Sequence, residues 1–237
     1  MAKALAALKA VGGQTDSILI ASPFPLQRLG IFGGTFDPVH CGHLAIADTA
    51  LSQLQLDQVR FLPVGLPPHR SEPLTPEHHR VAMLQIATVE SQKYVVDDWE
   101  LRQSAVTYTY LTLQYFKRNN DAHLYFLMGM DSLIQFLTWR EWQHILELCH
   151  LVVYRRRDSS LDDVPDVLRD RLIHATNFDM SKQQNKTGDI YVLDAEEVAV
   201  SSTELREGLK HPESVEDALA PPAVLHYIKQ NRLYRYA

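Results

Sequence analysis

Residues 29–43 of this chain read LGIFGGTFDPVHCGH. A short apolar run ends in Gly33 and Gly34, as a buried strand does where a turn begins. Gly42 and His43 then open a segment whose apolar residues recur at the spacing of one helix face. The members of this face are Leu44, Ala47, Leu51 and Leu54. The stretch therefore predicts a strand, a loop and a helix in immediate succession.

The predicted loop suits a phosphate group. Its two glycines let backbone amides approach a ligand without an intervening Cβ, and the start of the following helix favours anions. His40 and His43 are three residues apart, so both imidazoles can point into one cavity and donate hydrogen bonds to phosphate oxygens. On these residues alone, a tight turn with two incidental histidines remains the alternative.

A zinc site made of His40, Cys41 and His43 is a further alternative for the same loop. Three ligands within four residues would need unusual geometry, and no CxxC or HxxxH pair accompanies them. We therefore predict no metal bound by the protein side chains here.

Strand-like and helix-like segments alternate through most of the chain. Further strands are expected at residues 58–64, 94–96, 123–128, 151–154 and 190–200, and helices at 75–91, 109–120, 164–173, after 201 and at 222–230. Trp139 and Trp142 lie three apart on another predicted helix, so either ring could belong to the core or stack on a ligand. Alternation of this kind predicts an α/β fold, a doubly wound parallel sheet. Ligands of such sheets bind beyond the carboxyl ends of the strands.

A second candidate phosphate site follows the last predicted strand, where residues 200–206 read VSSTELR. Ser201 and Glu204 have the spacing of a capping box. The cap does not explain Arg206, which lies one turn into the helix. A cap and a phosphate site are compatible, because both use the helix N-terminus. The chain has neither a Walker A motif nor a GxGxxG motif.

Composition limits the class of protein. The 237 residues carry a net charge of −6, so there is no overall basic field for nonspecific nucleic-acid binding. Cys41 and Cys149 form no disulfide framework, which fits a cytoplasmic protein. No apolar run reaches the roughly 18 residues of a membrane helix, and the first residues lack the apolar core of a signal peptide. We expect an N-terminal extension at 1–28 and a single domain with C-terminal helices at 29–237.

The two candidate phosphate sites resemble the signatures of a known superfamily. GTFDPVHCGH at 34–43 is similar to the (T/H)xGH signature of nucleotidyltransferases, and residues 200–206 are similar to their ISSTxIR signature, with Val200 and Leu205 in place of isoleucine. Further stretches resemble bacterial nicotinate-nucleotide adenylyltransferases over residues 29–237. They are 67–70, 100–101, 107–113, 129–133, 138–142 and 150–156; Arg157 replaces a proline that is frequent in the family.

The resemblance implies a Rossmann-like nucleotidyltransferase fold and the transfer of AMP from ATP to nicotinate mononucleotide, which gives deamido-NAD and pyrophosphate. ATP would lie between the two signatures, with Mg²⁺ held mainly by its phosphates. The implied partners are ATP and nicotinate mononucleotide, and we expect the protein to bind neither nucleic acid nor a membrane. The implied catalytic residues are His40, His43 and Arg206; the ATP site comprises Gly33, Gly34, Thr35, Phe36, Gly129, Asp131, Ser202 and Thr203; the mononucleotide site comprises Thr109, Trp139 and Arg140.

The acceptor phosphate is already anionic, so the reaction needs no general base, and catalysis should consist of positioning and charge stabilisation. Transferases for phosphopantetheine or nicotinamide mononucleotide are alternatives within the superfamily. A cytidylyltransferase for choline or glycerol phosphate would carry an RTxGIST-like second motif, which residues 201–206 do not match. A non-catalytic nucleotide sensor would be expected to lack a signature residue, whereas His40, His43 and Arg206 are all present.

Overall fold

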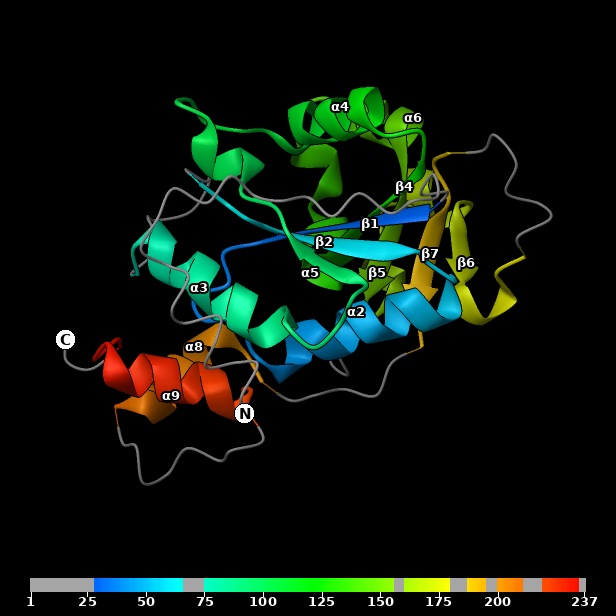
Figure 1. Ribbon diagram of the computed structural model, residues 1–237. Helices are drawn as coiled ribbons and strands as arrows, with labels where there is room; N and C mark the ends of the chain where they lie inside the picture. Colours follow the sequence, from blue (N-terminus) through cyan, green and yellow to red (C-terminus); the bar gives the residue numbers. More distant parts are fainter. Residues whose placement is uncertain are drawn as a thin grey trace.

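A computed structural model describes residues 28–65, 75–155, 160–179, 187–194, 200–210 and 219–234. Within them, a seven-stranded parallel sheet has the strand order β3-β2-β1-β4-β5-β7-β6 (Figure 1). The prediction of a parallel α/β sheet is confirmed. The strands are β1 (Arg28–Gly34), β2 (Gln58–Pro63), β3 (Tyr94–Val96), β4 (His123–Gly129), β5 (Cys149–Tyr154), β6 (Leu172–His174) and β7 (Ile190–Leu193).

Helices cover both faces of this sheet. The α-helices are α2 (Cys41–Gln53), α3 (Glu77–Thr88), α4 (Thr109–Asn119), α5 (Met130–Ile134), α6 (Trp142–Leu148), α7 (Asp166–Arg169), α8 (Ser202–Leu209) and α9 (Pro222–Gln230). The short 3-10 helices are η1 (Trp99–Arg102), η2 (Phe136–Thr138), η3 (Leu161–Asp163) and η4 (Ala175–Asn177).

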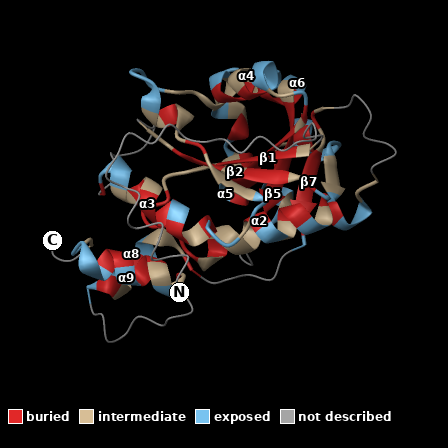
Figure 2. Cartoon of the chain, viewed as in Figure 1, coloured by how far each residue is buried: buried red, intermediate tan, exposed pale blue. Residues whose placement is uncertain are grey.

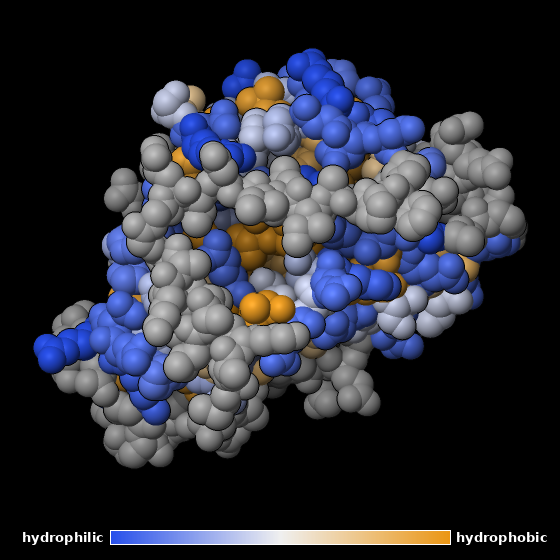
Figure 3. Space-filling view, viewed as in Figure 1, coloured by the Kyte–Doolittle hydropathy of each residue, from blue (hydrophilic) through white to orange (hydrophobic). Residues whose placement is uncertain are grey.

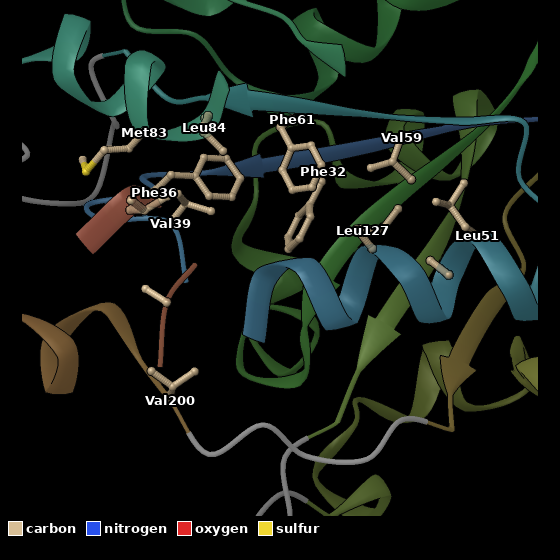
Figure 4. Close-up of a cluster of buried hydrophobic side chains, with 14 of the residues drawn as sticks. Phe32, Phe36, Val39, Leu51, Val59, Phe61, Met83, Leu84, Leu127 and Val200 are labelled. Atoms are coloured by element: carbon tan, nitrogen blue, oxygen red, sulfur yellow. The ribbon is translucent and has the colours of Figure 1, made fainter. Parts of the chain in front are cut away.

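Each face of the sheet has its own hydrophobic core. Side chains of α2, α3, α8 and α9 join one cluster, and those of α4, α5, α6 and α7 join the other. Neighbouring strand residues point to opposite faces, so Phe32 of β1 belongs to the first cluster and Ile31 to the second. Figure 2 shows the buried strands between half-exposed helices, and Figure 4 shows Phe32, Phe36 and Phe61 gathered in the first cluster.

The direction of winding reverses between β1 and β4. From β1 the chain builds outward through β2 and β3, then returns to place β4 on the opposite side of β1. Phe32 pairs with Leu127, two residues before the last residue of each strand. Gly34 and Gly129 therefore end neighbouring strands at the same edge of the sheet, which is where such folds bind ligands.

Two predicted helices differ from the structure. The segment expected to be helical at 164–173 contains α7 and then the edge strand β6, which pairs only with β7 among the described strands. Trp139 and Trp142 do not share a helix: Trp139 follows η2 in an extended conformation, Glu141 has a left-handed φ of 57°, and Trp142 begins α6. The residues of β6 continue the apolar spacing of α7, and a single left-handed residue such as Glu141 leaves no periodicity in the sequence.

Other boundaries shift by a few residues. The helix expected at 75–91 begins at Glu77 and ends at Thr88, and β7 ends at Leu193, while 195–199 lie outside the described residues. The strand that opens the domain begins at Arg28. Residues 1–27 lie outside the described ranges, so the division into an extension and a domain stays a prediction. None of the described helices is both long and apolar enough to cross a membrane.

Candidate active site

The loop that follows β1, residues 35–40, is called the signature loop below. Phe36 adopts a left-handed φ of 49° and is 1% exposed. Its ring packs against Phe32 and Phe61, with centroids 5.7 and 5.8 Å away. A Cβ on Gly34 would lie 2.9 Å from the Phe36 ring, so a side chain at position 34 would displace it. The second glycine of the pair is thus required by the close approach of this ring.

His40 and His43 meet at the first turn of α2, as the sequence predicts. Their ring centroids are 3.7 Å apart, and the His40 N–H donates to Nδ1 of His43 over 3.3 Å. Because Nδ1 accepts this bond, a neutral His43 ring carries its proton on Nε2. The edge of the His43 ring faces Phe36, 4.9 Å away between centroids. The loop backbone and the aromatic core therefore fix the orientation of this imidazole.

Side chains from α3 and α8 hold the carbonyl groups of the signature loop. Arg80 donates to the carbonyls of Thr35 (2.8 Å) and Val64 (2.9 Å), which follow β1 and β2 respectively. Arg206 donates to the carbonyl of Asp37 over 2.6 Å. Ser202 donates through its hydroxyl to the carbonyl of Pro38 over 3.0 Å. These bonds bring the two signatures together, although more than 160 residues separate them.

Ser201 caps α8 as predicted. Its hydroxyl accepts from the Glu204 N–H over 3.1 Å, and the Glu204 carboxylate accepts from the Ser201 N–H over 2.8 Å. Arg206 donates a second bond to the Thr203 hydroxyl over 3.1 Å. In the described structure, Ser202 and Arg206 therefore bond to protein atoms next to the expected phosphate position.

The residues expected to bind the mononucleotide lie on the opposite face of the sheet. The Trp139 ring packs edge-on against Phe126 of β4, with centroids 6.1 Å apart. The Phe126 ring also lies 3.8 Å from where a Gly33 Cβ would be. The Phe126 ring therefore lies between Gly33, near the end of β1, and the Trp139 ring. The half-buried Trp139 ring has both a core contact and exposed surface.

Arg140 and Thr109 are brought near each other by Tyr108. The Arg140 guanidinium lies over the Tyr108 ring, 4.9 Å from its centroid, and Thr109 is the next residue and begins α4. Gly129 and Asp131 lie at the end of β4 and in the first turn of α5, and both are exposed. Among the described residues other than its two chain neighbours, none has a heavy atom within 4 Å of the Cβ position of Gly129. Figure 3 shows one face of the molecule, with apolar residues at the bottom of a hollow near its centre.

Sequence reasoning missed a group of polar residues beneath the signature loop. Arg80 is 2% exposed, and burial lowers the pKa of its guanidinium while the nearby Asp37 opposes that effect. Asp37 is 3% exposed and accepts a hydrogen bond of 2.6 Å from the Tyr234 hydroxyl. Asp37 could have been singled out from the sequence, because it lies within the first signature. No pattern in the sequence around Arg80 or Tyr234 indicates these contacts.

A buried carboxyl group was also missed. Glu100 of η1 accepts a hydrogen bond of 2.7 Å from the Thr112 hydroxyl of α4. Burial raises the pKa of Glu100 to about 7; the Thr112 hydrogen bond opposes this effect, and Asp97 adds to it. The Glu100 carbonyl lies 3.0 Å from where a Gly65 Cβ would be. Glu100 thus contacts the segment after β2 through its backbone and helix α4, which Thr109 begins, through its side chain.

Metal ligands are not clustered in the described part of the chain. No group of three or more His, Cys, Asp or Glu side chains there could hold a metal ion. The groups around the signature loop are imidazoles, a guanidinium and hydroxyls, which suit phosphate oxygens. Magnesium prefers oxygen ligands and is often held by substrate phosphates and water. The described residues therefore fit a metal that arrives on a nucleotide.

Comparisons with known proteins show what the whole chain is similar to. The cytidylyltransferase-like family model matches residues 31–208. The chain is 36% identical over 210 residues to a probable nicotinate-nucleotide adenylyltransferase of Neisseria meningitidis, covering 88% of this chain and 99% of that protein. It is 37% identical over 211 residues to the protein of the same description from Pseudomonas fluorescens, covering 88% and 98%.

A solved structure has the same fold. Plasmodium falciparum nicotinic acid mononucleotide adenylyltransferase complexed with NaAD aligns with a TM-score of 0.67 and 22% identity, covering 88% of this chain and 97% of that one. At this identity the likeness concerns the fold. The family model and the two sequence relatives place the chain in the cytidylyltransferase-like family, among the nicotinate-nucleotide adenylyltransferases.

Proposed function

We propose that this protein transfers the AMP moiety of ATP to the phosphate of nicotinate mononucleotide, forming deamido-NAD and releasing pyrophosphate, as a step of NAD synthesis in the cytoplasm. The observation that carries the proposal is the contact between the two signatures. Arg206 of α8 donates to the Asp37 carbonyl of the signature loop. This contact supports the proposal because it brings the candidate phosphate-binding groups of both signatures to the place where the winding of the sheet reverses.

The reaction requires one bond to form and one to break. An oxygen of the mononucleotide phosphate attacks the α-phosphorus of ATP, and the bond from this phosphorus to the bridging oxygen of the β-phosphate breaks. The attacking oxygen carries a negative charge already, so no proton has to be removed. The protein has to align two polyanions and stabilise the charge that develops on the leaving pyrophosphate.

The histidines suit the triphosphate. His43 offers Nε2–H as a donor, since its Nδ1 accepts from the loop backbone. His40, whose ring is tilted by 34° to that of His43, is held by the same turn. We assign both imidazoles to charge stabilisation at the triphosphate. Gly33, Gly34, Thr35 and Phe36 would shape the surrounding phosphate pocket.

Arg206 and the hydroxyl groups of α8 would bind the outer phosphates. Ser202 and Thr203 stand at the N-terminus of this helix, which favours anions. Arg206 has donors beyond the two bonds it makes to the Asp37 carbonyl and the Thr203 hydroxyl. Gly129 and Asp131 would border the adenosine, because both are exposed at the end of β4.

Magnesium would be carried by the triphosphate. When bound there, it neutralises phosphate charge and favours departure of pyrophosphate. The phosphates and water would supply its ligands.

The pyridine carboxylate would be received near the start of α4. Thr109 begins this helix, and Arg140 lies over the neighbouring Tyr108 ring. Backbone N–H groups there could donate to both carboxylate oxygens, with Trp139 on the pyridine face. The amide of nicotinamide mononucleotide presents an NH₂ group to one donor, which leaves a buried group unpaired.

Release of pyrophosphate tests the proposal. With ATP and Mg²⁺ present, we expect pyrophosphate to appear only after nicotinate mononucleotide is added, in amounts equal to the dinucleotide formed. Pyrophosphate release that ignores the mononucleotide would contradict the assignment.

A further inference from the structure

The segment after α9 contacts the signature loop from a distant part of the chain. The Tyr234 hydroxyl donates a hydrogen bond of 2.6 Å to Oδ1 of Asp37, across 197 positions. Asp37 is 3% exposed, and Tyr234 is half-buried. Burial, together with the hydrogen bond to Asp37, raises the pKa of the Tyr234 hydroxyl. The hydroxyl therefore keeps its proton and acts as the donor at neutral pH.

Both ends of this hydrogen bond are placed by unusual backbone conformations. Tyr234 has a φ of 57°, and Arg232, two residues earlier, has a φ of 52°. Phe36, which precedes Asp37, has a φ of 49°. Left-handed φ values are rare for bulky residues and persist only where the surroundings determine them. The two chain segments thus adopt costly conformations at the point where they meet.

The backbone of Asp37 connects this contact to α8. The carbonyl group of the same residue accepts from Arg206 over 2.6 Å. One residue of the loop is therefore held through its side chain by Tyr234 and through its backbone by Arg206. On the other side of the loop, Cys41 N–H, the first amide of α2, donates to the Leu219 carbonyl just before α9 over 3.0 Å. The segments that precede and follow α9 thus both form hydrogen bonds at the signature loop or directly after it.

The helix itself is attached elsewhere. Tyr227 of α9 contacts Nδ1 of His79 of α3 through its hydroxyl, over 2.8 Å. This hydrogen bond joins the two helices and involves no residue of the signature loop. The docking of α9 and the contact of Tyr234 with the loop are therefore separable.

We propose that Tyr234 is a positioning residue for adenylyl transfer: its hydrogen bond to Asp37 holds the signature loop in the shape that presents His40 and His43 to the triphosphate. The inference rests on the proposed function. Tyr234 touches no reacting atom in it, and acts through Asp37 and the loop. Loss of its hydroxyl is expected to lower turnover with little effect on folding.

Tyr234→Phe removes the hydroxyl and keeps the ring. Tyr227→Phe, on the preceding helix α9, is the matched control. Misplacement of a positioned group by about 1 Å can cost about a hundredfold in rate, and we expect kcat of Tyr234→Phe to fall about tenfold to a hundredfold. The KM for the mononucleotide should stay within about twofold, because its site lies on the other face of the sheet. Tyr227→Phe should keep the wild-type kcat, and both variants should have similar melting temperatures.

Hydrogen exchange gives a readout that does not depend on activity. Amides of residues 35–43 should exchange about tenfold faster in Tyr234→Phe than in the wild type or in Tyr227→Phe. An unchanged exchange rate and kcat in Tyr234→Phe would overturn the inference. So would equal losses in both variants that follow their melting temperatures, since these would indicate general docking of α9. A wild-type protein that forms no dinucleotide would refute the proposed function, and the exchange experiment would still decide whether Tyr234 holds the loop.

Discussion

The imidazole rings of His40 and His43 lie with their centroids 3.7 Å apart, and Gly42 between them leaves room for the His40 ring. A Cβ at position 42 would lie 3.0 Å from His40 Nδ1 and 3.1 Å from its Cε1. Both distances are shorter than a side-chain carbon normally tolerates. A side chain at this position must therefore displace the imidazole.

Gly42→Ala should separate catalysis from stability. Alanine is the better helix former by about 1 kcal/mol, which offsets the cost of shifting the His40 ring and the Val200 side chain by a few tenths of an ångström, so the melting temperature should stay close to that of the wild type. Its kcat should fall about tenfold to a hundredfold, because small displacements of a positioned group are costly. Wild-type turnover in Gly42→Ala would show that the placement of His40 is not needed.

His43→Ala should fold and lose most of its turnover. Loss of one preorganised donor of this kind typically costs on the order of 10²–10³ in rate. His78→Ala is the control, since His78 is exposed on α3. Initial rates of dinucleotide formation at saturating substrates measure the effect. A well-folded His43→Ala with near-normal turnover would remove this residue from the mechanism.

Arg206→Ala should weaken ATP binding more than mononucleotide binding. The arginine lies at the second signature, and its charge-assisted bonds to phosphate would account for about a tenfold or larger change. Lys210→Ala, at the C-cap of the same helix, is a matched control, because Lys210 is exposed and pairs with Glu207. Separate titrations of ATP and of the mononucleotide measure the two affinities. An equal loss of both affinities, or a larger loss for the mononucleotide, would contradict the assignment of Arg206 to the ATP phosphates.

Glu100→Gln should stabilise the protein at high pH. The folded state raises the pKa of this carboxyl from 4.5 to about 7. The folded state therefore favours the protonated form, so the wild type loses stability as the pH rises from about 4.5 through about 7. Glutamine keeps an acceptor for Thr112 and has no charge to bury. Since a tenfold change in an ionisation constant is about 1.4 kcal/mol, the gain at pH 8 could reach roughly 3 kcal/mol.

Urea unfolding at pH 5 and pH 8 measures the difference between Glu100→Gln and the wild type. The difference should be larger at pH 8. Glu90→Gln, at an exposed position, should show almost none at either pH. If Glu100→Gln raises the free energy of unfolding equally at pH 5 and pH 8, ionisation of Glu100 is not the cause.

Much of this fold could be predicted from the sequence. The glycine-terminated strand at 28–34, the helix face from Leu44 and the buried strands at 123–129 and 149–154 follow from local periodicity. The capping box of Ser201 and Glu204 was recognisable from two residues. That both signatures meet at one edge follows from parallel strands sharing their carboxyl ends.

What the sequence did not reveal depends on contacts between distant residues. Arg80 holds loop carbonyls, and Tyr234 holds Asp37, through side chains whose neighbours in the sequence give no pattern. Edge strand β6 depends on pairing with β7. The individual roles of the ATP-binding and mononucleotide-binding residues stay predictions, because the contacts described here are within the protein.

The most direct test of the central claim is a competition between acceptors. The protein is given ATP, Mg²⁺ and equal concentrations of nicotinate mononucleotide, nicotinamide mononucleotide and phosphopantetheine, with the His43→Ala variant in parallel, and the products are resolved by mass. We predict that deamido-NAD is the main product, favoured over NAD by about tenfold to more than a hundredfold, and that it almost disappears with His43→Ala. A dinucleotide formed mainly from another acceptor, or ATP consumption without any adenylylated product, would contradict the proposed function.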